Sequence, residues 1–122
     1  MVEEDVGYSF AMSLRGEAFY PSELDVVVDA NLETLLSLDP GSTSKSGRVL
    51  SNGVLHIKGD SIDALYRFAK RVLENAVGVT AVEFDVARFF SGQCNLEISA
   101  TEIAQISELG GDLSISCYDN ED

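Results

Sequence analysis

Three separated segments of the chain alternate apolar and polar residues, and this period of two constrains the fold more than any other feature. The segments run from Tyr8 to Gly16, from Val79 to Arg88 and from Asp112 to Tyr118. Successive side chains of a β-strand point to opposite faces, so each segment predicts a strand with one buried and one solvated face. Strands of this kind pair mainly antiparallel, because parallel strands are usually covered on both faces.

The alternation also predicts which side chains each strand buries. The expected core residues are Tyr8, Phe10, Met12 and Leu14, then Val82, Phe84 and Val86, and finally Leu113, Ile115 and Cys117. Glu83 and Asp85 consequently fall on the solvated side of their strand.

Two further strand features are predicted from local sequence. Asn52-Gly53 separates two apolar runs, and both residues tolerate positive φ, so the pattern predicts a tight hairpin over residues 48–59. The segment around Leu96 and Ile98 predicts another short strand.

Apolar residues at intervals of three and four predict the helices. The clearest helix follows Asp60 or Ser61 as its cap and continues to Ala76. A shorter helix is expected after Ser99, because Ser99 and Glu102 have the spacing of a capping box. Its buried face is expected to hold Ile103, Ile106 and Leu109.

A third helical region is predicted between Pro21 and Pro40. Proline suits a first helical turn, and Leu24, Val28 and Leu32 recur at helical spacing. The three consecutive valines at 26–28 weaken this helix, so we allow for a break near Asn31.

Together these elements predict a single α+β domain over residues 1–122. Its expected form is a two-layer sandwich, in which two or three helices pack on one face of a mainly antiparallel sheet of five to six strands. The short acidic ends, 1–5 and 119–122, are expected to be mobile.

The sequence also favours a cytoplasmic location. No apolar run approaches the roughly 20 residues that cross a bilayer, and the acidic start Met1–Asp5 has the wrong charge for a signal peptide. Cys94 and Cys117 could form at most one disulfide, and in the cytoplasm both are expected to stay reduced.

Negative charge is the most unusual property of the chain. It carries 21 acidic and 8 basic residues, a formal net charge of −13. The acids concentrate in residues 1–39 and 72–122, whereas six of the basic residues lie between 40 and 71. Such a surface repels nucleic acid and anionic membranes and attracts a basic protein.

No arrangement of residues specifies a reaction, a cofactor or a metal site, so we expect no enzyme. His56 is the only histidine, and Glu83 and Asp85 are typical of the wet side of an alternating strand. A small-ligand pocket or an enzyme would have to involve His56, Lys58 and Arg67 beside the expected hairpin.

Several short motifs resemble those of a bacterial domain-of-unknown-function family, the one numbered 4279. They are Pro21-Ser22-Glu23-Leu24, Leu38-Asp39-Pro40, Lys45-Ser46-Gly47, Glu108-Leu109-Gly110 and a last strand ending at Tyr118. Two features depart from that pattern: a longer first helical region, and Val54-Leu55-His56 where a tryptophan is expected. The resemblance implies a small α+β fold and no known activity.

The charge and compartment favour a non-enzymatic binding protein, similar to the acidic immunity proteins with which bacteria neutralise nuclease toxins. The expected partner is a basic protein whose cationic cleft is occluded, with no role for nucleic acid, membrane or cofactor. A structural or regulatory homodimer joined through a sheet edge is the alternative. The candidate partner-binding acids form two sets: Glu23, Asp25, Asp29 and Glu33 on the expected first helix, and Asp119, Glu121 and Asp122 at the end.

Overall fold

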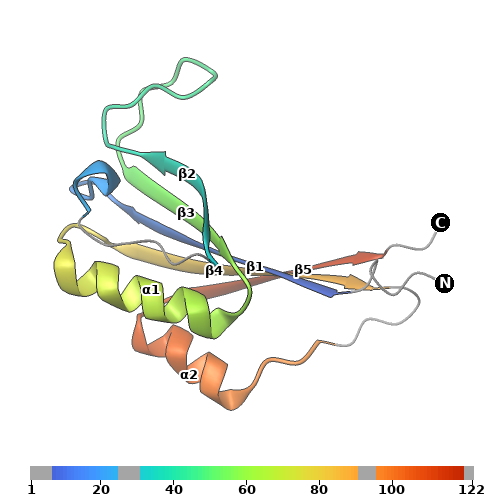
Figure 1. Ribbon diagram of the computed structural model, residues 1–122. Coiled ribbons are helices and arrows are strands. Elements are labelled where there is room, and N and C mark those ends of the chain that lie inside the picture. The colour runs from blue at the N-terminus through green and yellow to red at the C-terminus, as the bar shows by residue number, and fades with distance from the viewer. Residues whose placement is uncertain (1–6, 25–30, 91–95, 120–122) are drawn as a thin grey trace.

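A five-stranded sheet with two α-helices on one face forms the protein (Figure 1). The computed structural model describes residues 7–24, 31–90 and 96–119. Its elements are β1 (Gly7–Gly16), the short 3-10 helix η2 (Pro21–Glu23), β2 (Glu33–Leu38), β3 (Gly53–Gly59), α1 (Ile62–Asn75), β4 (Ala81–Phe90), α2 (Ala100–Glu108) and β5 (Asp112–Asp119). The expected α+β two-layer sandwich is confirmed.

The strands lie in the order β2-β3-β1-β4-β5. β1 is central and pairs antiparallel with β3 and β4, and β2 pairs antiparallel with β3. β5 alone lies parallel to its neighbour β4. A parallel pair needs a crossover connection, and the chain between β4 and β5, which includes α2, provides one. The sheet is therefore mainly antiparallel with one parallel edge.

α1 supplies most of the covering layer, as its periodicity predicts. The side-chain oxygen of Ser61 accepts a hydrogen bond from the backbone N–H of Ala64 at 3.1 Å and caps the helix. The buried stripe Ile62, Leu65, Phe68, Ala69 and Val72 packs in one core with inward residues of the strands, Met12, Leu14, Leu55, Ile57, Val82, Phe84 and Val86.

The prediction of a helical region between Pro21 and Pro40 is wrong for the residues that the structure describes. Only residues 21–23 are helical, as one 3-10 turn, and residues 33–38 form β2. The leucines of this region fit both a helical and a strand period. Pairing with the exposed edge of β3 favours the strand. Residues 25–30 lie outside the described part of the chain.

The prediction of a tight hairpin at Asn52-Gly53 is also wrong. β3 begins at Gly53 and pairs with β2, and the connection between them is a long arm held by one bridge between Thr43 and Val49. Gly53 is needed for space, because a Cβ there would lie 1.8 Å from the carbonyl oxygen of Phe19.

The segment before α2 is no strand over its described residues. Leu96 and Ile98 instead pack against the core from a connecting segment. The hydroxyl oxygen of Tyr8 accepts a hydrogen bond from the backbone N–H of Glu97 at 3.1 Å and holds that segment to β1.

α2 begins with the predicted capping box between Ser99 and Glu102, which is confirmed. Only Ile106 of its expected apolar face is buried, whereas Ile103 is 53% exposed. α2 is fastened to α1 by polar contacts: Tyr66 Oη donates to Glu108 Oε2 at 2.7 Å, and Lys70 Nζ lies 3.3 Å from the same oxygen. We call Tyr66, Lys70 and Glu108 the helix clasp.

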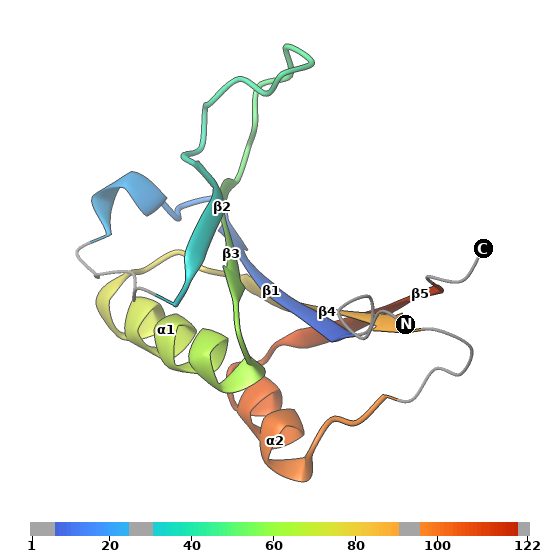
Figure 2. The same cartoon turned by 45° about the vertical axis from the view of Figure 1, so that its right-hand side comes forward.

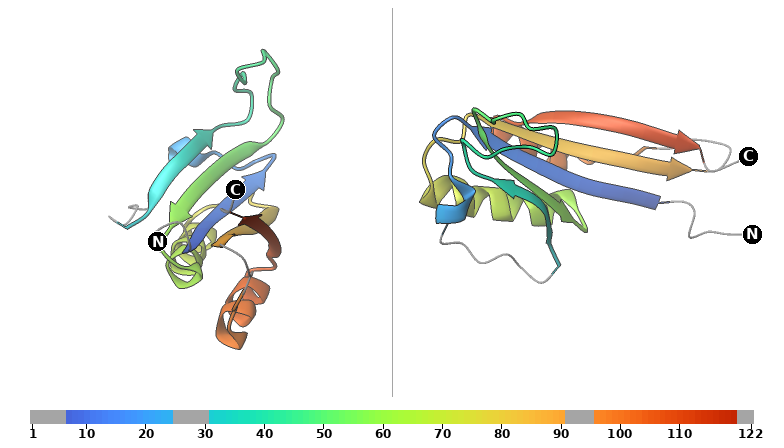
Figure 3. Two further views of the ribbon diagram at one scale, coloured as in Figure 1. Left: turned by 90° about the vertical axis from the view of Figure 1, so that its right-hand side faces the viewer. Right: turned by 90° about the horizontal axis from the view of Figure 1, so that it is seen from above.

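The final strand is where predicted, but its predicted burial is wrong. All eight residues of β5 are exposed, including Leu113, Ile115 and Cys117. β1, β4 and β5 run on past the end of α1, and the shorter α2 covers little of the edge (Figure 3). Asp119, expected in a mobile end, is the last residue of β5, while residues 1–5 and 120–122 lie outside the described part.

Close backbone packing at Gly16 yields a testable prediction. A Cβ at Gly16 would lie 1.7 Å from the carbonyl oxygen of Gly78, so Gly16→Ala must displace backbone. We expect it to lower the free energy of unfolding by about 3 kcal/mol. Gly7→Ala, on the same strand with no atom within 4 Å of the added Cβ, should change it by less than about 0.5 kcal/mol. Urea unfolding of both variants checks this, and equal effects would contradict it.

The helix clasp predicts a pH-dependent stability. The hydrogen bond from Tyr66, with help from Lys70, lowers the pKa of Glu108 below its ordinary 4.5. A lowered folded pKa contributes stability above the unfolded pKa, and that contribution is lost as the pH falls through the folded pKa. Tyr66→Phe should therefore lower the unfolding temperature at pH 7, and the difference from wild type should shrink below pH 4.5. Tyr118→Phe, which leaves the clasp intact, should show no such trend in thermal unfolding.

Candidate functional site

The side of the sheet turned away from α1 and α2 has no covering layer among the described residues (Figure 2). Alternation places on this side the neighbours of the buried strand residues, and the pairing register sets them side by side. We call this side the open face. Its polar members include Ser13 and Arg15 on β1, Glu33 on β2, His56 and Lys58 on β3, Glu83 and Asp85 on β4, and Asp112 on β5.

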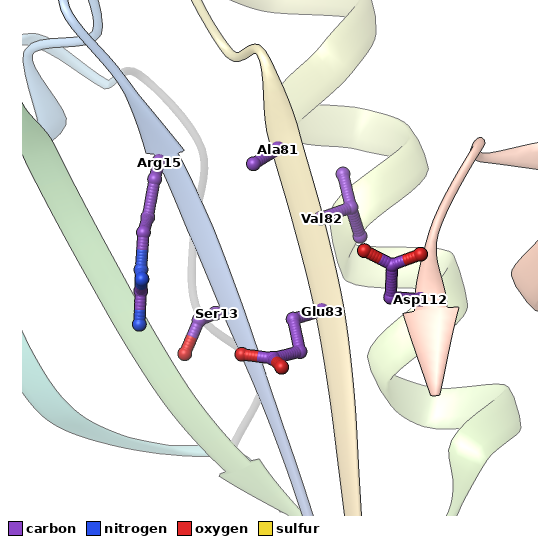
Figure 4. Close-up of a pocket in the computed structure, with 6 residues that line it drawn as sticks. All are labelled: Ser13, Arg15, Ala81, Val82, Glu83 and Asp112. Carbon is purple, nitrogen blue, oxygen red and sulfur yellow. The ribbon is translucent and has the colours of Figure 1, made fainter. Parts of the chain in front are cut away.

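A hollow of about 190 Å³ lies in the open face across three strands. Ser13, Arg15, Glu83 and Asp112 supply its polar lining, with Ala81 and Val82. Figure 4 shows Glu83 between Arg15 on one side and Asp112 on the other. The register explains this arrangement, because Glu83 pairs with Ser13 across β1 and with Asp112 across β5.

Carboxylates dominate the charge of the open face. Glu33, Glu83, Asp85 and Asp112 face two cations, Arg15 and Lys58. The two ion pairs within the described residues, Arg67 with Asp63 and Lys70 with Glu108, both lie in the helical layer. The charges of the open face are thus not satisfied by each other and are available to another molecule. Carboxylates in such a setting accept charge-assisted hydrogen bonds from lysine and arginine side chains.

The residues suggested for a small-ligand pocket are not brought together. His56 and Lys58 lie on the open face of β3, whereas Arg67 lies on α1 in the layer on the opposite side of the sheet, 2.9 Å from Asp63. His56 Nε2 is buried without a hydrogen-bond partner. The backbone of His56 pairs with Ser13 and Leu36, so the histidine sits within the sheet surface rather than in a cleft of its own.

The fold separates Glu23 and Glu33, the two described members of the first predicted set of partner-binding acids. Glu23 lies in η2, where Ser22 bonds to Asp39 just after β2, whereas Glu33 begins β2 at its other end. The length of β2 puts roughly 17 Å between those ends. Glu33 belongs to the open face, and Asp25 and Asp29 lie outside the described residues.

Asp119, the one described member of the second predicted set, lies at the edge of the sheet formed by β5. Asp119 ends β5 beside Phe90 of β4, while Glu121 and Asp122 lie outside the described residues. β2 and β5 form the two edges, and alternation along β5 turns Asp119 away from the open face that holds Glu33, so these two acids do not share one patch.

Sequence reasoning missed the acids that the sheet does bring together. Alternation already directed Glu83 and Asp85 outward, and that signal could have placed them in the partner-binding set. Alternation directed Asp112 outward as well, but its position beside Glu83 depends on the parallel register of β5, which no local signal predicts.

Other classes of site receive no support from the described geometry. No group of three or more His, Cys, Asp or Glu side chains in residues 7–24, 31–90 and 96–119 is placed to hold a metal ion. Neither described helix is long and apolar enough to cross a membrane.

Comparison with protein-family models, with curated proteins and with solved structures finds no match for the chain. The resemblance to the 4279 family therefore stays a prediction.

The clustering of acids predicts a cost in stability. Glu83 and Asp112 are directly paired on adjacent strands, and like charges in that position destabilise a sheet. Asp112→Asn should raise the free energy of unfolding by about 0.2–1 kcal/mol, and the gain should shrink in 1 M NaCl because salt screens the repulsion. Glu97→Gln, an exposed acid in a connecting segment, is the control in urea unfolding. A loss of stability in Asp112→Asn would contradict the repulsion.

Proposed function

We propose that the protein is a non-enzymatic immunity protein or inhibitor, which neutralises a basic protein in the cytoplasm, such as a nuclease toxin. One observation carries the proposal: the open face presents four carboxylates on a rigid sheet with no covering layer in the described chain. A nuclease needs a cationic cleft to hold phosphate, and such a cleft is complementary to this face.

The size of the open face suits this role. Five strands span about 24 Å across the sheet, and strands of six to ten residues run about 20–33 Å along it. The projected area is roughly 500–800 Å², which at its upper end matches the ~800 Å² that each partner buries in a standard protein–protein interface. A preorganised sheet surface also loses little conformational entropy on binding.

The net charge of −13 supports the same role through kinetics. Complementary potentials raise the association rate of a basic partner and depress encounters with acidic ones. Arg15 and Lys58 would then set the register of docking, since a partner must place its cations over the carboxylates and away from these two side chains.

Matched charge variants test the proposal on a complex with the product of the adjacent gene. The double variant Glu83→Gln/Asp85→Asn should bind at least tenfold more weakly and lose protection against toxicity on co-expression. Glu74→Gln/Glu97→Gln removes the same charge from the helical side and should bind within about twofold of wild type. Calorimetry at two salt concentrations should show weaker binding in high salt. If no complex forms and growth is not rescued, the proposed function is wrong.

The two exposed sheet edges favour a second candidate, a structural or regulatory homo-oligomer. Leu35 and Leu36 on β2 are 47% and 43% exposed, and β5 is exposed throughout. A row of unpaired backbone groups can template pairing with another copy. Sedimentation equilibrium distinguishes the two: a dimer whose mass persists in moderate salt, without any partner, supports the second candidate.

A further inference from the structure

β5 is an edge strand with an open pairing side. It lies at the end of the strand order, and β4 is its only partner among the described strands. All eight of its residues are exposed. Over residues 112–116, its second row of backbone N–H and C=O groups therefore faces outward, available to a further strand.

An apolar shelf adjoins this edge on the helical side. Leu113 and Ile115 of β5 are 36% and 43% exposed, and Ile103 of α2 is 53% exposed. Ile103, Ile106 and Leu113 line a groove of about 290 Å³ between α2 and the start of β5, with Ser107, Gly110 and Gly111. A strand laid along β5 would direct every second side chain onto this shelf.

The opposite side of the same edge is acidic. Asp112 points to the open face beside Glu83. Asp85 lies two residues further along β4 on the same face, where it pairs with Ser114. An added strand would direct its remaining side chains over this side. The edge thus offers apolar contacts on one face of an added strand and carboxylates on the other.

We infer that β5 receives an added β-strand from the basic partner, an extended segment that alternates apolar residues with lysine or arginine. Main-chain hydrogen bonds would bind the segment, the shelf of Ile103, Leu113 and Ile115 would select its apolar residues, and the acids of the open face would select its cations. This inference rests on the proposed function and adds the mode of docking.

Charge argues against a second copy of the chain as the occupant. Each copy carries −13, and two β5 edges would bring Asp112 and Asp119 of both copies into one junction. Such a pairing adds repulsion where a basic segment adds attraction.

β2 at the other edge is a poorer template. It has six residues, and its register shifts between Thr34 and Leu36. Short edge strands and bulges are features that discourage strand addition.

A synthetic peptide tests the inference directly. The probe is an eight-residue peptide of alternating lysine and valine with blocked ends, and its partner control has glutamate in place of lysine. We expect the basic peptide to bind with salt-sensitive affinity and the acidic one not to bind. Hydrogen exchange should slow at amides of β5 and remain unchanged in β2.

Two matched variants locate the binding edge. Ile115→Lys and Leu36→Lys add the same charge at positions that are both 43% exposed, one at each edge strand. Ile115→Lys places a charge on the shelf and should weaken peptide binding at least tenfold, whereas Leu36→Lys should leave it within about twofold. Circular dichroism and thermal unfolding confirm that both variants fold.

Three outcomes with the peptides and the isolated protein would overturn the inference. They are equal weakening by both variants, binding of the acidic peptide as strong as that of the basic one, and a salt-resistant dimer that Ile115→Lys dissociates, which would make a second copy the occupant. The proposed function is tested by a different experiment, the complex with the full-length partner, so the two proposals can fail independently. If the full-length partner is released by Glu83→Gln/Asp85→Asn but not by Ile115→Lys, the open face binds it without strand addition, and only the inference of this section is lost.

Discussion

One helix has to bury a five-stranded sheet, and most of the structure follows from that constraint. α1 has 14 residues, so it is about 21 Å long and roughly 10 Å wide with its side chains, against a sheet about 24 Å across. It can therefore cover the central strands only. Met12, Leu14, Ile57 and Phe84 are completely or almost completely buried beneath it. The edge strands remain exposed, and the second face of the sheet has no described layer at all. Both candidate binding surfaces thus lie on parts of the sheet that α1 does not cover.

The local patterns predicted those elements whose burial agrees with their periodicity. β1, β4 and α1 are each buried on one side, so the spacing of their apolar residues matches the period of a strand or a helix and predicts the element. The capping box at Ser99 was predictable for a similar reason, because its two hydrogen bonds are both local.

The errors arose where distant partners decide the outcome. The leucines of β2 fit a helix or a strand, and only the open edge of β3 selects the strand. Gly53 was taken for a turn residue, but the carbonyl oxygen of Phe19 requires it. β5 alternates like a buried strand, yet no described helix lies over Ile115. The candidate site shows the same division: the outward direction of Glu83 and Asp85 was predictable, whereas their proximity to Asp112 depends on a parallel register set by a crossover.

The central position of β1 has a consequence for how the chain must fold. β1 is synthesised first, yet its neighbours are β3, which begins at Gly53, and β4, which ends at Phe90. β1 therefore leaves the ribosome long before either partner exists, and its pairing contacts span much of the chain. High contact order of this kind slows folding and prolongs the exposure of unpaired strands. A chain with Phe10, Met12 and Leu14 uncovered exposes apolar surface during that interval, and a net charge of −13 opposes association between copies.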